Sequence, residues 1–511
     1  MKFSSAETEL KLALSPSVAK SVFSLPALKQ KGVAKPKSQR LVATYYDTPE
    51  KDLARRGLSL RIRQENDKRV QTVKATGDAG VANSRGEWEW PVERATPDLG
   101  LVKEAAVAKL LAGVSEDRLK PVVVTDVVRT KQDLKIGGDV IEAALDQGSI
   151  KAGKAKEDVC ELELELREGA PASLYRLALE LNSVIPFDIE VESKAARGFR
   201  LKEGSPPRAS KPSDISLNAD DSVIEALRAI LLETLGHLLA NQPAALAGDP
   251  EGVHQVRVAV RRIRSALRLF SPHLEPHATR LFEDKLRQAG QTIGEARDWD
   301  VFCGEVLAQV SENPEARKSS EMMKAPAEAR RAAAHKTGVR QLQDKSFRAL
   351  VLGLAAWIEG GREDSSQVGG DGLKRDIGVI AGNLLDRLDA KATKRGSAVR
   401  PDASAEELHP LRKSLKKVRY SVEFLESIFP AKKAKRFLSH LETLQDALGE
   451  INDAAMAARL AEGLAADKHL ELAPSVAAIS LNRGRAAQDA IKDLPKTWRA
   501  YCDEPRFWRR G

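Results

Sequence analysis

The side chains best suited to chemistry appear early in the chain, in the segment Glu7-Thr8-Glu9-Leu10-Lys11. If this segment is a β-strand, alternate side chains share a face, so Glu7, Glu9 and Lys11 point one way and Leu10 the other. One strand then offers two carboxylates of the kind that bind metal ions and one ammonium of the kind that binds phosphate. The alternation therefore predicts one wall of a polar site.

Five further segments before residue 200 alternate charged and apolar residues in the same way. Glu161, Glu163 and Glu165 would place three like charges on one face, which is unfavourable unless cations lie opposite. Arg61 and Arg63 supply a basic counterpart. On an open sheet with one wet face such charges would simply meet water. The opposed signs favour a closed barrel with the charges inside, because barrel strands alternate interior and exterior residues. The five segments are 58–63, 69–74, 85–90, 140–146 and 160–166.

A lumen of this composition would suit a polyanion whose charge is shared between protein cations and a divalent metal ion. Oxygen ligands without histidine or cysteine favour Mg²⁺ or Mn²⁺ over zinc. Arginine forks fit phosphate oxygens in pairs, whereas lysine acts as a point charge. The sequence therefore predicts a site for a phosphate chain and a metal.

The motifs of this half, taken in order over roughly residues 1–203, resemble the CYTH family, the triphosphate tunnel metalloenzymes. The resemblance implies an eight-stranded antiparallel β tunnel barrel with flanking helices, which hydrolyses or cyclises triphosphate compounds with Mg²⁺ or Mn²⁺. The motifs that carry it are Glu7-x-Glu9-x-Lys11, Tyr45-Tyr-Asp-Thr-Pro49, Leu60-Arg-Ile-Arg63, Lys74, Leu145-Asp-Gln-Gly148, Cys160-Glu-Leu-Glu-Leu-Glu165 and Ser193-Lys-Ala-Ala-Arg-Gly198.

The resemblance also implies roles for single residues. The metal would be held by Glu7, Glu9, Asp146, Glu161 and Glu163. The phosphates would be held by Lys11, Arg61, Arg63, Lys74, Arg85, Arg129 and Lys194. Catalysis would depend most on Glu7, Glu9, Lys11, Arg61, Arg63 and Lys74. Glu142 and Glu165 face the same way and are expected to support these ligands.

The composition is that of a globular protein with more than one domain. A chain of 511 residues exceeds one ordinary core, and 42% hydrophobic with 30% charged residues is typical of soluble domains. The net charge of +9 is a modest basic excess that hints at an acidic partner. The three cysteines are far apart and favour a reducing cytoplasm. No 18-residue uncharged run exists, so we expect no membrane span, and Glu7 and Glu9 argue against a signal peptide.

The hydrophobic period changes near residue 203. Before it the chain is mostly strands, with helical stretches at 101–111 and 172–184. After a stretch rich in Pro, Ser, Lys and Asp, a period of 3.6 begins with an apolar helix at 223–239 and continues to about 493. We therefore expect an α+β multidomain protein with a β domain at 1–203, a linker at 204–217 and an all-α domain at 218–505.

The helical half contains an internal repeat at a constant offset of 155 residues. Two duplicated helical bundles are expected, over about 218–370 and 371–505. The matched positions are His254 and His409, Arg257 and Arg412, Arg261 and Lys416, Arg262 and Lys417, Arg264 and Arg419, and Asp298 and Asp453.

Each copy pairs an apolar seam with a basic stripe on a helix. In the first copy, Val253, Val256 and Val260 begin a seam at 3-4 spacing that runs to Phe270. A solvated helix edge, with lysine and arginine stems covering the core, would look the same in one copy. Recurrence in both favours a binding ridge made of His254, Arg257, Arg261, Arg262, Arg264, His409, Arg412, Lys416 and Arg419.

These stripes resemble the CHAD domain, a helical module associated with binding inorganic polyphosphate. The resemblance covers about residues 218–505. Pro410 departs from the pattern, because proline disfavours the helical turn before it. We therefore expect the second helix to begin at His409 and His409 to be displaced as a ligand.

The combined hypothesis is a cytoplasmic, metal-dependent inorganic triphosphatase that hydrolyses tripolyphosphate to pyrophosphate and phosphate, with long-chain polyphosphate bound by the helical half. An adenylate cyclase or a thiamine triphosphatase would use the same lumen. A non-catalytic polyanion-binding scaffold is the rival from another class. Nucleic acid is disfavoured as a partner, because aromatic residues for base stacking make up only 5% of the chain.

Overall fold

The computed structural model describes residues 6–78, 83–312, 314, 317–361, 366, 368–466 and 472–509. The chain divides into two compact units. Unit 1 comprises residues 1–211, 235–249 and 343–363, and unit 2 comprises residues 212–234, 250–342 and 364–511. Residues 205–217, in the predicted linker, contain neither helix nor strand.

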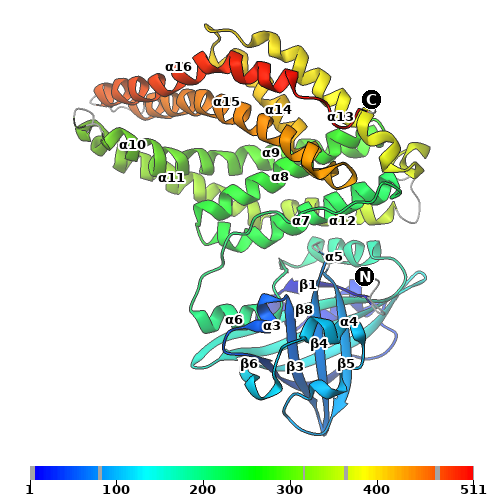
Figure 1. Ribbon diagram of the computed structural model, residues 1–511. Helices are drawn as coiled ribbons and strands as arrows, with labels where there is room; N and C mark the ends of the chain where they lie inside the picture. The colour runs from blue at the N-terminus through cyan, green and yellow to red at the C-terminus, as the bar shows by residue number, and fades with distance from the viewer. Residues whose placement is uncertain are drawn as a thin grey trace. The chain divides into compact units, whose positions relative to one another are not determined.

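Unit 1 is built around the antiparallel sheet that the alternating segments predict (Figure 1). Within the described residues the sheet has nine strands, in the order β5-β4-β3-β2-β6-β7-β8-β1-β9. The strands are β1 (Ala6–Ala13), β2 (Lys37–Asp47), β3 (Leu58–Glu65), β4 (Lys68–Asp78), β5 (Asn83–Val92), β6 (Lys120–Ile136), β7 (Asp139–Ala152), β8 (Ala155–Glu168) and β9 (Asp188–Glu190).

The expected closed barrel of eight strands is wrong in its details. β1 pairs with β8 over Thr8–Ala13, but it pairs with β5 only over Ala6–Glu9. Over Lys11–Ala13 the short strand β9 takes the place of β5 beside β1. The two ends of the sheet are thus joined at one end of β1 and separated by a ninth strand at the other, so the sheet is not closed along its full height.

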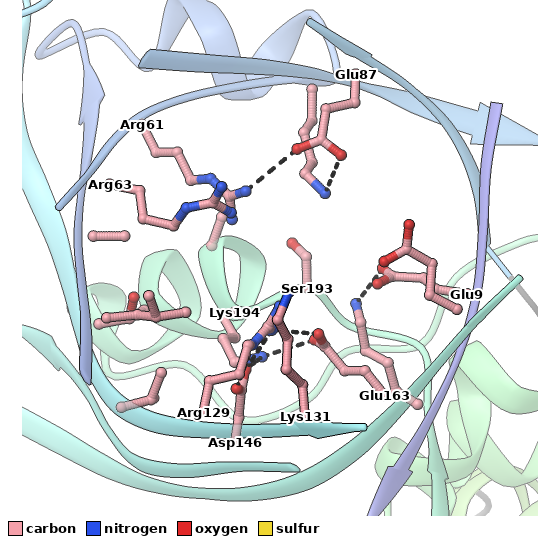
Figure 2. Close-up of a pocket in the computed structure, with 18 of the residues that line it drawn as sticks. Glu9, Arg61, Arg63, Glu87, Arg129, Lys131, Asp146, Glu163, Ser193 and Lys194 are labelled. Carbon is pink, nitrogen blue, oxygen red and sulfur yellow. Dashed lines mark hydrogen bonds and ion pairs between the residues drawn. The ribbon is translucent and has the colours of Figure 1, made fainter. Parts of the chain in front are cut away.

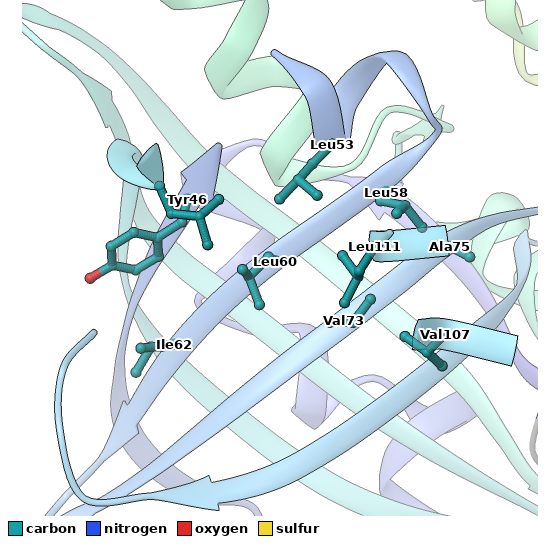
Figure 3. Close-up of a cluster of buried hydrophobic side chains, with 10 residues drawn as sticks. Tyr46, Leu53, Leu58, Leu60, Ile62, Val73, Ala75, Val107 and Leu111 are labelled. Atoms are coloured by element: carbon teal, nitrogen blue, oxygen red, sulfur yellow. The ribbon is translucent and has the colours of Figure 1, made fainter. Parts of the chain in front are cut away.

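Apolar residues on the outer face of the sheet form the core that fixes the inner face. Leu60, Ile62 and Val73 are almost fully buried in a cluster with short helices beside the sheet (Figure 3). Because strand side chains alternate, burying Leu60 and Ile62 outward directs Arg61 and Arg63 inward. Each large apolar side chain buried here contributes about 1.5–3 kcal/mol. The helices of the N-terminal part are α1 (Pro16–Ala19), α2 (Pro26–Lys29), α3 (Asp52–Arg55), α4 (Ala105–Leu111), α5 (Ala172–Val184) and α6 (Lys194–Glu203).

The rest of the described chain is helical, as the 3.6-residue period predicts. In unit 2, α8 packs against α9 and α14, and α15 lies along α16 (Figure 1). The helices are α7 (Val223–Leu246), α8 (Pro250–Phe270), α9 (Pro276–Val301), α10 (Leu307–Glu312), α11 (Arg317–Gln343), α12 (Lys345–Gly360), α13 (Ile377–Arg395), α14 (Ala405–Leu425), α15 (Ala431–Ala466) and α16 (Ala473–Asp503).

The internal repeat is visible in the element bounds. α8 begins at 250 and ends at 270, and α14 begins at 405 and ends at 425, so both bounds differ by the offset of 155. The same offset relates the first residues of α9 and α15. Both apolar seams are buried: Val256, Val260 and Ile263 in α8, and Leu411, Leu415 and Val418 in α14.

The expectation that the second helix begins at His409 is wrong. α14 begins at Ala405, because Ser404 and Glu407 form a capping box: the Ser404 hydroxyl accepts from the Glu407 N–H at 3.2 Å, and the Glu407 carboxylate accepts from the Ser404 N–H at 2.9 Å. Pro410 is accommodated inside the helix.

None of the helices in the described part of the chain combines the length and the hydrophobicity that a bilayer crossing requires.

Candidate active site

The inner face of the sheet lines a polar cavity of about 600 Å³ (Figure 2). The side chains around it are mostly charged, and acidic residues are as numerous as basic ones. The basic residues are Lys11, Arg61, Arg63, Lys74, Arg129, Lys131, Arg167 and Lys194. The acidic residues are Glu9, Glu65, Glu87, Glu89, Glu142, Asp146, Glu163 and Glu165.

Strand register explains which charges meet in this cavity. Directly opposed residues on neighbouring antiparallel strands point to the same face with their Cβ atoms about 5 Å apart. Arg129 of β6 is opposed to Asp146 of β7, which is opposed to Glu161 of β8. Register also opposes Lys11 to Glu163, Glu9 to Glu165, Glu142 to Glu165, and Lys74 to Glu87.

An acidic cluster lies on the β7–β8 side. Asp146, Glu161 and Glu163 are all buried, and each offers a carboxylate oxygen within 4.8 Å of the other two. The ammonium of Lys194, the first residue of α6, lies 2.8 Å from Asp146 and 2.9 Å from Glu163 and also contacts Glu161. Arg129 completes the cluster: its Nε and Nη2 atoms donate to the two carboxylate oxygens of Asp146, each at 2.7 Å.

The charges of this cluster sustain one another. Burial disfavours the charge of Lys194, but the attraction of Asp146, Glu163 and Glu161 outweighs it and raises its pKa well above the ordinary value. Burial likewise opposes ionisation of Glu163, yet Lys194 and Arg129 hold the pKa of that carboxyl well below its usual range. Asp146, whose pKa is likewise lowered by Lys194 and Arg129, and Glu163 are therefore ionised at neutral pH, which is the form that binds metal ions.

The cluster fits a hard divalent cation. Its donors are carboxylate oxygens only, which suits Mg²⁺ or Mn²⁺ and not a thiolate- or imidazole-binding metal. The Lys194 ammonium stands among three carboxylates where such a cation would be attracted. Lys194, predicted to hold phosphate, thus contacts the predicted metal ligands directly.

The opposite wall is basic. Arg61 of β3 donates to Glu87 of β5 at 3.3 Å, and Lys74 of β4 lies 3.0 Å from the same carboxylate. Arg63, two residues along β3, donates to Glu89 at 3.4 Å. Burial and the repulsion of Arg61 lower the pKa of Arg63, so an anion between the two would relieve this repulsion. In Figure 2, Arg61 and Arg63 point into the cavity across from the acidic cluster.

The first strand, β1, contributes two charged side chains to the cavity. Lys11 and Glu9 are buried and form an ion pair at 3.0 Å, and Glu9 lies outside the acidic cluster of β7 and β8. Glu7 and Arg85 lie opposite each other on β1 and β5. The side chains of both residues lie outside the described part of the structure, so their predicted roles stay predictions.

Sequence reasoning missed five charged residues of the cavity. Glu65 follows Arg63 at period two on β3 and lies 3.7 Å from it. Glu87 and Glu89 follow Arg85 at period two and could have been found from that alternation. Lys131 follows Arg129 in the same way on β6 and lies 3.2 Å from Glu142. Arg167 follows Glu165 at period two on β8, so it places a cation at the end of the acidic face of that strand. It lies 3.1 Å from Glu142.

A second charged cluster lies in unit 2, where α8 packs against α14. Arg257 is paired with Asp298 at 2.8 Å, and its repeat equivalent Arg412 with Asp453 at 3.9 Å. Within the described residues, Arg261 has no acidic partner at ion-pair distance; it lies 6.0 Å from the ring of Tyr420.

Lys416, the repeat equivalent of Arg261, likewise has no ion pair among the described residues. Burial, together with the repulsion of Arg261, Arg412 and Arg257, lowers the pKa of Lys416 to about 6. The basic stripes of the two copies thus meet in one cluster, which we call the cation cluster: Arg257, Arg261, Arg412 and Lys416. Arg257 and Arg412 each have one carboxylate partner, whereas Arg261 and Lys416 have none among the described residues.

The other predicted ridge residues have different surroundings. Arg262 is buried between Glu423 at 3.1 Å and Glu233 at 3.5 Å, an arrangement typical of a core ion pair. Arg419 is paired with Glu423 at 2.7 Å, and Arg264 is half-buried. His409 shares a hydrogen bond with Asn452 at 3.2 Å. Burial, then the nearby Arg297, lowers the pKa of His254.

Two family models match separate parts of the chain. The CYTH domain model matches residues 5–199, and the CHAD domain model matches residues 229–462. Residues 1–203 and 218–505 were the extents expected from the motifs.

Three individual relatives extend this comparison. A protein from Haemophilus influenzae named inorganic triphosphatase is 32% identical over 202 residues; the match covers 38% of this chain and 54%, about half, of that protein. An uncharacterized protein of Mycobacterium tuberculosis is 27% identical over 75% of both chains. The crystal structure of the CHAD domain from the plant Ricinus communis matches with a TM-score of 0.50 and 28% identity, over 59% of this chain and 98% of that one.

Proposed function

Because the chain contains a CYTH domain and a CHAD domain, we propose that it is a metal-dependent inorganic triphosphatase that also binds long-chain polyphosphate. The observation that carries the proposal is the charge pattern of the cavity: a buried acidic cluster lies on one side of it, and Arg61, Arg63 and Lys74 lie on the other. The likeness to the protein from Haemophilus influenzae supports the hydrolase activity.

The chain's own residues bind and align the phosphate chain. Arg61 and Arg63 present guanidinium forks that match phosphate oxygens in pairs, and Lys74 adds a point charge beside them. Phosphoryl transfer needs mainly alignment and charge stabilisation, which fixed side chains supply without reorganising during the reaction.

The acidic cluster would hold Mg²⁺ or Mn²⁺ through Asp146, Glu161 and Glu163. When bound, such an ion neutralises phosphate oxygens and lowers the pKa of an attacking water. Arg129 and Lys194 lower the pKa values of Asp146 and Glu163 and so keep these two carboxylates ionised.

Inorganic tripolyphosphate is the substrate that we favour over ATP and thiamine triphosphate. The cavity lining is dominated by charged side chains, whereas binding a base or a thiazolium ring calls for an apolar or aromatic surface. Tyr45 is the one aromatic residue of the described lining. The attached helical domain, if it binds polyphosphate, would further favour an inorganic substrate.

Polyphosphate binding by the helical domain rests on the cation cluster. Arg261 and Lys416 lack acidic partners and repel their neighbours, so the cluster gains most from an anion that bridges them. Polyphosphate supplies closely spaced negative charges on one flexible chain, which matches cations contributed by two helices.

A phosphate-release panel tests the enzymatic proposal. Purified protein is incubated with tripolyphosphate, ATP or thiamine triphosphate, each with Mg²⁺ or Mn²⁺, and both orthophosphate and cyclic AMP are measured. The proposal expects orthophosphate from tripolyphosphate at the highest rate, and none in EDTA. Cyclic AMP as the main product from ATP would establish a cyclase instead. If no product forms from any of the substrates, the protein is a non-catalytic binding scaffold and the enzymatic proposal fails.

A further inference from the structure

Arg197 lies directly behind the acidic cluster, outside the cavity lining, and no role in the proposed site has yet been given to it. It is buried, and it donates from Nη1 to Glu161 at 2.8 Å and from Nε to Glu157 at 2.7 Å. Glu190 lies 3.8 Å away as a third carboxylate partner. A buried guanidinium with these partners is held in one orientation, so it can fix Glu161 on its inner side.

The local sequence explains how Arg197 reaches this position. Ser193 caps α6: its hydroxyl accepts from the Ala196 N–H at 3.1 Å. Gly198 lets the helix approach β6 closely, because a Cβ atom at this position would lie 2.3 Å from a methyl group of Val123. Lys194 and Arg197, three residues apart, share a face of α6 and point into the acidic strands.

The two cations divide Glu161 between them. Lys194 contacts Oε1, on the cluster side, and Arg197 contacts Oε2, on the far side. Glu161 is only 1% exposed, so water cannot replace either partner. Without Arg197, Glu161 would stand buried beside Asp146 and Glu163 with one oxygen unpartnered, a cost that favours a rotated side chain.

We propose that Arg197 is a positioning residue, which holds Glu161 with one oxygen aimed into the acidic cluster and thereby sets the affinity of that cluster for the divalent metal. This inference rests on the proposed metal-dependent function. Partners that orient metal ligands typically change metal affinity tenfold to a hundredfold when they are replaced.

Direct metal binding is the measurement that isolates this role. Free Mn²⁺ gives a sharp six-line EPR signal that is lost on binding, so the full-length protein can be titrated without turnover. We expect Arg197→Met to weaken Mn²⁺ binding by about tenfold or more. Arg197→Lys, which restores the charge without the fork, should recover part of the loss. In steady-state assays, the kcat of Arg197→Met should approach that of wild type as Mn²⁺ is raised.

Arg200→Met is the matched control. Arg200 lies on the same helix and pairs with Glu157 and Glu192, but it touches no carboxylate of the acidic cluster. It should bind Mn²⁺ like wild type. Should Arg197→Met fail to fold, Glu157→Gln tests the same idea from the half-exposed side, by loosening the grip on Arg197. It should weaken Mn²⁺ binding by a smaller factor.

The outcomes separate this inference from the proposed function. Folded Arg197→Met and Glu157→Gln variants that both bind Mn²⁺ as wild type does overturn the role of Arg197 and leave the triphosphatase proposal intact. An equal loss in Arg200→Met would assign the effect to helix stability and also overturn it. If wild type itself binds no Mn²⁺ and releases no phosphate, the proposed function fails.

Discussion

Two buried lysines, one in each unit, show how neighbours decide what the same side chain does. Lys194 lies among three carboxylates, and their attraction raises its pKa well above the ordinary value in spite of burial. Lys416 lies among arginines, and burial together with their repulsion lowers its pKa to about 6. The fold gives Lys194 carboxylate partners that keep it charged, whereas Lys416 lacks a partner that would stabilise its charge.

The same difference holds for the two sites as a whole, and it predicts which kind of ligand each site should bind. In the cavity of unit 1, acids balance bases, so a bare polyanion would have to break existing ion pairs. A phosphate chain that arrives with divalent cations satisfies both sets of charges at once. In the cation cluster of unit 2 only Arg257 and Arg412 have carboxylate partners, so an excess of positive charge remains and the cluster needs only the anion. We therefore expect metal dependence in the first site and not in the second.

The largest effect should come from removing one carboxylate of the acidic cluster. Glu163→Gln keeps the shape of the side chain but loses a charge that Lys194 and Arg129 now balance. Because a bound metal contributes several kcal/mol to charge stabilisation, we expect kcat for tripolyphosphate to fall about a thousandfold. The kcat is measured from phosphate release under saturating Mg²⁺.

The same variant tests the separation of the two sites. Polyphosphate binding, followed by gel shift or fluorescence, should be unchanged in Glu163→Gln and unaffected by EDTA. Loss of binding in either condition would mean that the two charge clusters form one functional site and would break the comparison.

The second largest effect should come from the unpaired cations. Replacing Arg261 and Lys416 together by alanine removes two contacts to polyphosphate, each worth about 1 kcal/mol, so we expect a loss of about 30-fold in affinity with tripolyphosphate hydrolysis retained. The matched control is Lys432→Ala with Lys433→Ala, which removes two exposed cations of α15. An equal loss in the control would show that net charge, not the cluster, binds polyphosphate.

Much of the barrel site could be predicted from the sequence, since period two fixes which face a charge occupies. Arg61 and Arg63 were assigned inward for that reason, as were Glu161 and Glu163. β6 (Lys120–Ile136) went unrecognised because its run of three valines, 122–124, hides the alternation that its burial pattern shows.

What the sequence could not supply is long-range pairing. Glu87 was visible on an alternating segment, but its partners Arg61 and Lys74 follow only from the order and register of β3, β4 and β5. The convergence of Arg261 and Lys416 across two repeats also depends on how α8 packs against α14. At His409 a local rule misled, because the capping box at Ser404 outweighs the cost of Pro410.

A pH titration sharpens the contrast at Lys416. With a pKa of about 6 in the free protein, this lysine is mostly neutral at pH 8 and becomes charged as the pH falls through 6. A polyanion binds the charged form better, so binding takes up a proton and affinity must rise as the pH falls. We expect an increase of about tenfold, ~1.4 kcal/mol, between pH 8 and pH 6.

Lys416→Arg is the control for this titration, because an arginine stays charged throughout. The variant should bind tightly at pH 8 and lose most of the pH dependence, apart from what His254 and His409 contribute. A wild-type protein whose affinity is flat over this range would contradict the assignment of Lys416 to the binding cluster.

Lys416 should have its smallest effect on thermal stability, and the sign of that effect should be opposite to that of Lys194. The folded-state pKa of Lys416 lies below the unfolded value near 10.4, so the unfolded chain binds more protons between these values and folding is disfavoured as the pH falls through that window. Lys416→Met removes this penalty, and we expect its Tm to rise by about 2–4 °C at pH 7, the shift that ~1 kcal/mol gives in a domain of this size. The gain in Tm from Lys416→Met should shrink towards pH 9.5.

Lys194→Met should have the opposite effect. It leaves three buried carboxylates without their shared ammonium partner and should lower the Tm of unit 1, since breaking a buried ion pair costs about 3–5 kcal/mol. Differential scanning calorimetry of the full chain measures both, and shifts of the same sign would mean that burial alone, and not the charge of the neighbours, sets the energy of these two side chains.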